Sequence, residues 1–171
     1  MKIAVVGNIA GGKTRLSRAL AGRYQLPLTH VDTLQFLPGM KMRPLPETRK
    51  SLLTVTAQDK WLIDGYGPLD LIEKRFQAAD RVVFIDFPIW RHYLWLTKRQ
   101  IANLWSRRPE LPQDCHELTW EHTLKLYKTL WQIHSKMRPE LLRIFSRETY
   151  REKMIFVRTV QEWREIFKNG I

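Results

Sequence analysis

Cysteine is nearly missing from this sequence, because Cys115 is the only one among 171 residues. A single thiol cannot close an internal disulfide, and it cannot supply the several thiolates of a structural zinc site. Long apolar runs are also missing, and none approaches the roughly 20 residues that span a bilayer. The apolar stretch at residues 3–6 is too short for the core of a signal peptide and ends at Gly7. These absences predict a cytoplasmic protein.

Acidic residues are few in comparison with basic ones. Asp and Glu together number 17 against 29 Lys and Arg, which gives a net charge of +12. Such an excess favours polyanionic partners, a class that includes nucleotides, nucleic acids and acidic membrane surfaces. The basic residues are dense between Arg91 and Arg108. The apolar content of 44% and the absence of repeats favour one globular domain over residues 1–171.

Short apolar segments rich in β-branched residues alternate with segments of helical periodicity, which predicts a parallel, doubly wound α/β sheet. Residues 38–46 are rich in proline and are expected to form a loop. The expected strands cover residues 2–6, 26–31, 61–63, 81–85 and 154–157. The expected helices around them cover about residues 13–23, 46–58, 69–77 and 162–168.

The pattern changes after the fourth expected strand. Apolar residues recur at helical spacing over residues 90–104 and again over 126–137. A short basic loop at 107–109 separates the two helices, and Pro139 kinks the second helix or starts a new one. These features predict a helical arm or lid over about residues 90–138, embedded in the domain.

A phosphate-binding motif follows the first expected strand. Residues 7–14 match G-x-x-x-x-G-K-[ST] in full, and the match opens a periodic helix. Glycines let backbone amides turn toward phosphate oxygens, and the helix N-terminus adds its positive dipole end. Lys13 is expected to reach the β- and γ-phosphates of ATP, and the Thr14 hydroxyl to bind Mg²⁺. The expected nucleotide-binding residues here are Gly7, Asn8, Ile9, Ala10, Gly11, Gly12, Lys13, Thr14 and Arg15.

Three carboxylates, Asp32, Asp64 and Asp86, follow three of the expected strands. Because open α/β sheets bind ligands beyond the carboxyl ends of their strands, all three are expected near the phosphate loop. Asp64 is the candidate for the Mg²⁺ site, and Asp32 for contact with the acceptor, as the base for its hydroxyl. Asp86 stays open between a supporting role and a helix cap. His30 either lines the acceptor pocket or is structural.

Arginine is the expected source of positive charge at the reacting phosphate, because phosphoryl transfer builds negative charge on equatorial oxygens. A closing arm would bring some of its arginines to the phosphates and exclude water. Arg99, Arg107 and Arg138 are the candidates for this catalytic role, and most other arginines of the arm are expected to be solvated or ion-paired. Trp90 is expected to pack against its neighbours, and Trp95 stays open between packing and base stacking.

The sequence resembles the adenylate kinase-like P-loop proteins, and within them most closely the FlaR-like group, named as DNA topology modulation proteins. The resemblance implies a P-loop NTPase fold with a five-stranded parallel sheet, helices on both faces and an inserted helical lid. It implies ATP and Mg²⁺ as well, and it places Arg158 where such kinases contact the adenine. The segments that carry the resemblance are residues 7–14, 30–32, 61–66, 85–88, 107–111 and 138–139.

The sequence also departs from adenylate kinases at two places. Those enzymes follow their Asp-Gly step with Phe-Pro-Arg, whereas Tyr66-Gly67-Pro68 stands here without the arginine. Their Thr-Gly-Asp acceptor motif is replaced by His30-Val31-Asp32. Both departures count against AMP as the acceptor.

The leading hypothesis is therefore an ATP-dependent kinase, a P-loop phosphotransferase that transfers the γ-phosphate to an unidentified small acceptor. The alternative is a DNA-associated ATPase or topology modulation regulator that uses nucleotide binding as a switch, which the +12 charge and the basic, aromatic arm favour. No standard DNA-reading motif is recognised, and this places the alternative second. The acceptor and the oligomeric state stay open.

Overall fold

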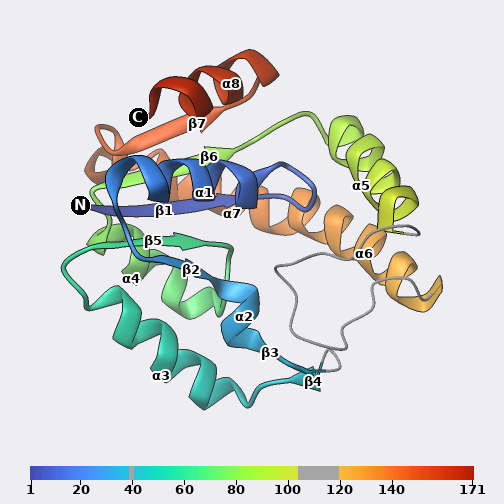
Figure 1. The fold of residues 1–171 in the computed structure, drawn as a ribbon, viewed down its shortest axis with the longest axis horizontal. Helices are drawn as coiled ribbons and strands as arrows, with labels where there is room; N and C mark the ends of the chain where they lie inside the picture. The colour runs from blue at the N-terminus through green and yellow to red at the C-terminus, as the bar shows by residue number, and fades with distance from the viewer. Residues whose placement is uncertain (39–40, 104–119) are drawn as a thin grey trace.

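The computed structural model describes residues 1–38, 41–103 and 120–171. In these residues the main sheet has five parallel strands in the order β2-β5-β1-β6-β7, and Figure 1 shows it at the centre of the molecule with helices around it. The α/β class and the five-stranded parallel sheet are thus confirmed. The strands are β1 (Lys2–Gly7), β2 (Leu28–His30), β5 (Trp61–Asp64), β6 (Arg81–Ile85) and β7 (Met154–Val157).

The central strands are apolar throughout because both faces of the sheet are covered. Along β1, Ile3 and Val5 pack on one face, whereas Ala4 and Val6 pack on the other, and all four are fully buried. The first face is covered by α1 (Lys13–Tyr24) and α8 (Val160–Asn169). The second is covered by α3 (Leu45–Thr56), α4 (Leu69–Ala78) and α7 (Arg138–Phe145).

The second strand is shorter than expected. It ends at His30, and Val31–Gln35 form the short helix α2, so the prediction of a strand up to residue 31 was wrong. The Thr33 hydroxyl donates a hydrogen bond to the His30 carbonyl at 2.7 Å, a local bond that competes with strand pairing. As a consequence, Asp32 lies in the first turn of α2 rather than at the end of a strand.

The segment after α2 is more ordered than the expected loop. It contains the antiparallel pair β3 (Phe36–Leu37) and β4 (Lys41–Met42), and α3 begins at Leu45 with Pro46 in its first turn. Arg43 donates from its backbone amide to the Gln35 carbonyl at 2.8 Å and from Nε to the Leu34 carbonyl at 3.0 Å. These bonds hold the hairpin, defined as residues 36–37 and 41–42, against α2.

Two helices follow β6, as expected for the arm. They are α5 (Ile89–Asn103) and α6 (Trp120–Gln132), which run side by side at one end of the molecule in Figure 1. Tyr93 and Tyr127 stack between them with ring centroids 5.9 Å apart, and the Tyr127 hydroxyl lies 2.5 Å from that of Thr97. A π-helical turn over Ile133–Met137 joins α6 to α7, so Pro139 stands in the first turn of a new helix. The basic loop expected between α5 and α6 lies outside the described residues.

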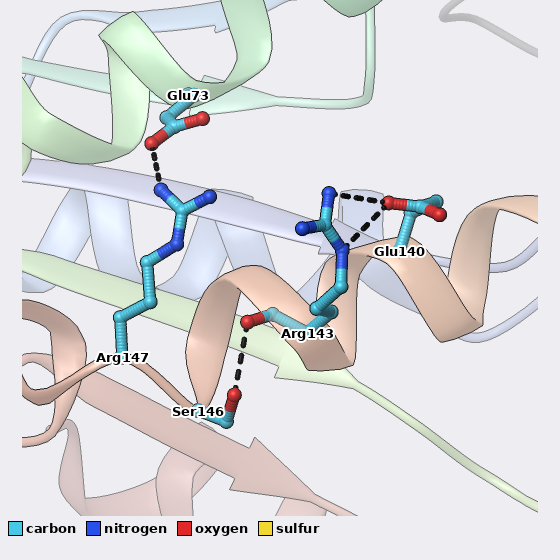
Figure 2. A network of polar contacts seen from close by, with 5 residues as sticks. All are labelled: Glu73, Glu140, Arg143, Ser146 and Arg147. Carbon is cyan, nitrogen blue, oxygen red and sulfur yellow. Dashed lines mark hydrogen bonds and ion pairs between the residues drawn. The ribbon is translucent and has the colours of Figure 1, made fainter.

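Ion pairs on the outer surface account for two of the basic residues near the arm. Figure 2 shows Arg147, after α7, directed at Glu73 of α4, and Arg143 directed at Glu140 of its own helix. Arg143 donates from Nε and a terminal nitrogen to the same oxygen at 3.1 and 2.9 Å. Exposed pairs of this kind contribute little to stability. Within the described ranges, no helix combines the length and apolar composition needed to cross a bilayer.

Candidate functional site

The phosphate loop joins β1 to α1 and has the backbone that its motif requires. Gly7 has a φ of 152°, and a Cβ there would lie 2.6 Å from the Ile85 carbonyl oxygen, so only glycine fits. Gly12, with a φ of 75°, precedes α1, and Ala10 also lies in the left-handed region at 58°. A non-glycine residue in that region is uncommon and marks stored strain. Because Lys13 begins α1, the N-terminus of this helix, with its positive dipole end, lies at the loop.

Both arm helices bind the phosphate loop directly. Asn8 donates from Nδ2 to the Leu130 carbonyl of α6 at 3.0 Å, and His92 Nδ1 of α5 lies 2.8 Å from the Ile9 carbonyl oxygen. Since a carbonyl only accepts, Nδ1 of His92 carries the proton. Burial lowers the pKa of His92 to about 4, with the charge of Lys13 acting in the same direction. The ring is therefore neutral at neutral pH.

Sequence reasoning did not find His92. It is a lone histidine on a helix, with no motif around it. Its position could have indicated the contact. His92 lies three residues after Ile89, at the start of the helix that follows β6, and β6 pairs with β1 and ends beside Gly7. Only the folded chain brings this ring to the loop, where a Cβ on Gly11 would lie 3.1 Å from a ring carbon.

Asp64 closes β5 beside the phosphate loop. In the parallel register it is paired with Val5, two residues before Gly7. Its Oδ2 lies 3.0 Å from His30 Nδ1, whereas its Oδ1 is buried and has no hydrogen-bond partner in the part of the chain that the structure describes. Buried carboxylate oxygens are normally paired, so this one is suited to an incoming ligand.

A magnesium ion fits this arrangement. Mg²⁺ takes one or two carboxylates together with phosphate oxygens and waters, and Thr14 and Asp64 line the same cavity. Among residues 1–38, 41–103 and 120–171, no group of three or more His, Cys, Asp or Glu side chains gathers into a metal site. An ion held here would thus depend on the phosphates of a nucleotide.

A buried arginine supports the turn after Asp64. Arg75 of α4 is 1% exposed and donates to the carbonyls of Gly65 and Tyr66 at 2.8 and 3.0 Å. Burial lowers its pKa to about 10, and the charge of Asp64 opposes that shift, so Arg75 is cationic at neutral pH. Its position in the sequence could have indicated this burial, because Arg75 follows Leu71 by four positions and therefore lies on the apolar face of α4.

The phosphate loop, Asp64 and the turn that follows it line a cavity of about 770 Å³, a size typical of small-molecule sites. The phosphate loop forms one wall, α2, the hairpin and the turn before α4 form a second, and α5, α6 and the π-helical turn form a third. The structure brings together five residues that were predicted separately: Lys13, Thr14, Asp32, Asp64 and Arg99 all line this cavity.

Two residues of α6 were not predicted. Lys125 and Thr129 line the cavity opposite the loop. Only arginines of the arm had been considered as partners for phosphate, and this lysine is one of several on an exposed helix face. Its signal was its spacing, because Lys125, Thr129 and Ile133 repeat every four residues and therefore share one side of the helix.

Arg138 lies elsewhere. Its Nε and a terminal nitrogen donate to the two carboxylate oxygens of Asp86 at 2.5 and 2.9 Å. Asp86 is buried at the end of β6, and this hydrogen bond raises the pKa of Arg138. The pair adjoins a separate cavity of about 10 Å³, room for one water, which His92 and His134 also line. Asp86 thus supports the fold around the loop through Arg138.

Of the other predicted arginines, Arg107 lies outside the described residues, and Arg158 does not line the large cavity. Arg158 follows β7, with its guanidinium 4.6 Å from the ring centre of Phe156 and its amide bonded to Glu162. Arg15 lines the cavity edge and also reaches α8, where its guanidinium lies 5.0 Å from the ring centre of Phe167.

The tryptophans of α5 divide between surface and cavity. Trp90 is 57% exposed, so the prediction that it packs in the interior was wrong; the guanidinium of Arg91 lies 4.8 Å from its ring centre instead. Trp95 is half-buried, lines the large cavity and meets Phe87 edge to face at 5.2 Å. The helical spacing was interpreted correctly. The side of α5 that carries His92 and Trp95 packs toward the phosphate loop and β6, and Trp90 lies on another side of the helix.

The chain matches no protein-family profile and no curated protein. Solved structures match it over nearly its whole length. A gluconokinase from Sinorhizobium meliloti 1021 is 14% identical at a TM-score of 0.53, with 99% of this chain and 88% of that chain covered. This chain has a P-loop kinase fold. Two shikimate kinases agree with this.

The shikimate kinase from Bacteroides thetaiotaomicron is 13% identical at a TM-score of 0.51 and covers 98% of this chain and 94% of its own. The shikimate kinase from Acinetobacter baumannii, in complex with shikimate, is 16% identical at a TM-score of 0.58 and covers 98% of this chain and 88% of its own. At such low identities, the similarity shows the fold alone. The resemblance to the FlaR-like group stays a prediction.

Proposed function

We propose that this chain is an ATP-dependent kinase that transfers the γ-phosphoryl group of ATP to a hydroxyl of a small acceptor. The observation that carries the proposal is one cavity in which Lys13 and Thr14 of the phosphate loop share a space with Asp32, Asp64 and Arg99. The likeness in fold to gluconokinase and shikimate kinases supports the same reaction class.

The nucleotide half of the site lies at the phosphate loop. Backbone amides at the start of α1 and the ammonium of Lys13 bind the phosphates of ATP. Thr14 and Asp64 would hold the Mg²⁺, which would neutralise part of the phosphate charge. Arg99, from α5, lines the cavity and supplies a further positive charge. The bond that His92 donates to Ile9 and the bond that Asn8 donates to Leu130 keep the loop in one conformation, so little reorganisation is needed when ATP binds.

The acceptor half lies toward β2 and β5. Asp32 is exposed in the first turn of α2 and takes the proton of the acceptor hydroxyl. The hydroxyl oxygen forms a bond to the γ-phosphorus while the bond from that phosphorus to the oxygen of ADP breaks. The helices α5 and α6 cover the cavity and reduce the access of water, which would otherwise compete with the acceptor.

The test is transfer of phosphate to a panel of small hydroxyl compounds in the presence of MgATP. Asp32→Asn should lower kcat by about 100-fold or more, because the proton acceptor is lost, and should leave the KM for ATP unchanged. Asp59→Asn is the matched control, since Asp59 is an exposed carboxylate in a turn far from the cavity lining. Formation of ADP without any phosphorylated product, or full activity of Asp32→Asn, would contradict the proposal.

A further inference from the structure

The wall formed by α2, the hairpin and the turn before α4 carries several apolar side chains. Phe36 and Met42 from the hairpin and Leu69 from the start of α4 line it, and Met137 of the π-helical turn lines the cavity from the third wall. Met42 is 64% exposed and Leu69 65% exposed, so both side chains are accessible to a ligand in the cavity. An acceptor that covers this wall gains binding free energy if it has an apolar face of its own.

The polar groups of the same wall include two carboxylates, an amide and an imidazole. Asp32 and Gln35 come from α2, and His30 with Asp64 comes from the ends of β2 and β5. The carboxylates accept hydrogen bonds from hydroxyl groups, and the Gln35 amide both donates and accepts. A second negative charge brought beside them would be repelled. This wall therefore suits a ligand with hydroxyl groups and no charge.

The arginines of these elements are bound to other groups of the protein. Arg43 donates from Nε to the Leu34 carbonyl at 3.0 Å and lies 3.7 Å from Glu47. Arg49 pairs with Asp70 at 3.0 Å, and Arg75 is buried under the turn that follows Asp64. Lys41 is exposed beside Met42 and is not part of the lining.

The cations that do line the cavity belong to its other walls. In the described part of the chain they are Lys13 and Arg15 of α1, Arg99 of α5 and Lys125 of α6, and no lysine or arginine of α2, the hairpin, α3 or α4 lines it. The positive charge is thus placed for the phosphates of ATP. Among the described residues, this wall offers no lysine or arginine to a carboxylate or phosphate on the acceptor, and burial of such a group without a cation is costly.

We infer that the acceptor is an uncharged, ring-bearing alcohol of the nucleoside class, rather than a sugar acid or a nucleotide. This inference rests on the proposed function and adds the class of its substrate. The ring lies on the apolar wall, and the sugar hydroxyls bond to Asp32 and Gln35. One hydroxyl attacks the γ-phosphorus, its proton passes to Asp32, and ADP leaves.

The experiment measures kcat/KM with MgATP for nucleosides, for ribose and for the anionic compounds shikimate, gluconate and AMP. The kcat/KM for nucleosides should exceed that for ribose and for the anionic compounds by about tenfold or more. This factor corresponds to the free-energy cost of one buried polar group without a partner. A higher kcat/KM for an anionic compound overturns the inference and leaves the kinase proposal standing. The same holds for a preference for ribose, which has no apolar base. No transfer to any compound overturns the kinase proposal itself.

A pair of matched variants tests the wall. Leu69→Ala removes an apolar group from the cavity and should raise the KM for the nucleoside about threefold to tenfold, with the KM for ATP unchanged. Leu53→Ala makes the same change on α3, where Leu53 is 45% exposed and outside the lining, and should have no effect. Equal behaviour of the two variants counts against the inference.

A variant that adds charge tests the selectivity. Leu69→Arg places a cation on the acceptor wall and should shift the ratio of kcat/KM toward the anionic compounds by about tenfold. Because Leu69 is exposed, the substitution is compatible with folding, and an unchanged melting temperature checks this. An unchanged ratio in a folded variant contradicts the proposed composition of the wall.

Discussion

His92 is a side chain whose role depends on its protonation state. The ring is buried, and its Nδ1–H donates to the Ile9 carbonyl of the phosphate loop. Burial and the charge of Lys13 lower its pKa, whereas the bond to Ile9 and the charge of Asp86 oppose that shift. Protonation would place a second positive charge beside that of Lys13 at the loop. The geometry of the nucleotide site is therefore linked to pH through this residue.

This linkage predicts a loss of stability in mild acid. The folded pKa of His92 is about 4, below its usual 6.5, so the unfolded chain binds the additional proton between these values. The contribution of His92 to the free energy of unfolding is fully present above about pH 6.5. It decreases as the pH drops toward 4, by up to about 3 kcal/mol. Urea unfolding of the wild type and of His92→Asn over this range measures the difference.

The asparagine variant serves as the control because its Nδ2 occupies the place of the ring Nδ1 and keeps a donor for the Ile9 carbonyl. It should lose less stability than the wild type between pH 6.5 and 4, and it should retain ATP affinity at pH 7.5. His92→Ala should weaken ATP binding about threefold to tenfold, since the loop loses one hydrogen bond. Parallel pH profiles of the wild type and the asparagine variant would contradict the assignment.

The site residues divide by how they could be predicted. Lys13 and Thr14 were found because the phosphate-loop motif is local, and Asp64 because a carboxylate followed an apolar strand. His92 and Arg75 were missed because what they contact, the Ile9 carbonyl and the turn after Asp64, is set by the folded chain. The spacing of residues along the sequence does not indicate such contacts.

At the scale of elements, the Asp86–Arg138 pair joins the end of β6 to the first residue of α7. Replacement of Arg138 by Met leaves the buried carboxylate of Asp86 without its partner. The variant should lose about 2 kcal/mol, less than for a fully buried pair because the Arg138 side chain is 36% exposed. The melting temperature should fall by about 4–8 °C.

Arg143→Met is the matched control, because Arg143 pairs with Glu140 on the exposed face of the same helix (Figure 2). It should change stability by less than about 0.5 kcal/mol. The double variant Asp86→Asn with Arg138→Met should be less destabilised than the sum of the two single variants. Additive effects would mean that the pair is not coupled. A loss of kcat with unchanged stability would favour the catalytic role predicted from the sequence.

Elements with strong local patterns were predicted well. The strands β5, β6 and β7 and the helices α1 and α4 agree with expectation to within one or two residues, because each is a continuous apolar run or an amphipathic segment bounded by a turn. The exceptions are short. The hairpin has two residues in each strand, and the π-helical turn at Ile133–Met137 has the periodicity of neither strand nor α-helix.

At the scale of the whole molecule, the net charge of +12 attracts polyanions whether or not they are substrates. The kinase account predicts that phosphoryl transfer at about 0.15 M salt is unaffected by duplex DNA. Any retention of DNA at low salt should weaken steeply, by about 0.9 log unit per log unit of salt for each phosphate contact. Strong stimulation of ATP hydrolysis by DNA would favour the alternative of a DNA-associated ATPase.

The central claim is that the loop between β1 and α1 binds the phosphates of ATP through its amides and Lys13. Titration calorimetry with MgATP measures this directly on the wild type, on Lys13→Ala and on Lys50→Ala, which removes an exposed lysine of α3. The account predicts one site, weakened at least about tenfold in Lys13→Ala and unchanged in Lys50→Ala. Equal affinity of the wild type and Lys13→Ala, or no binding to the wild type, would contradict it.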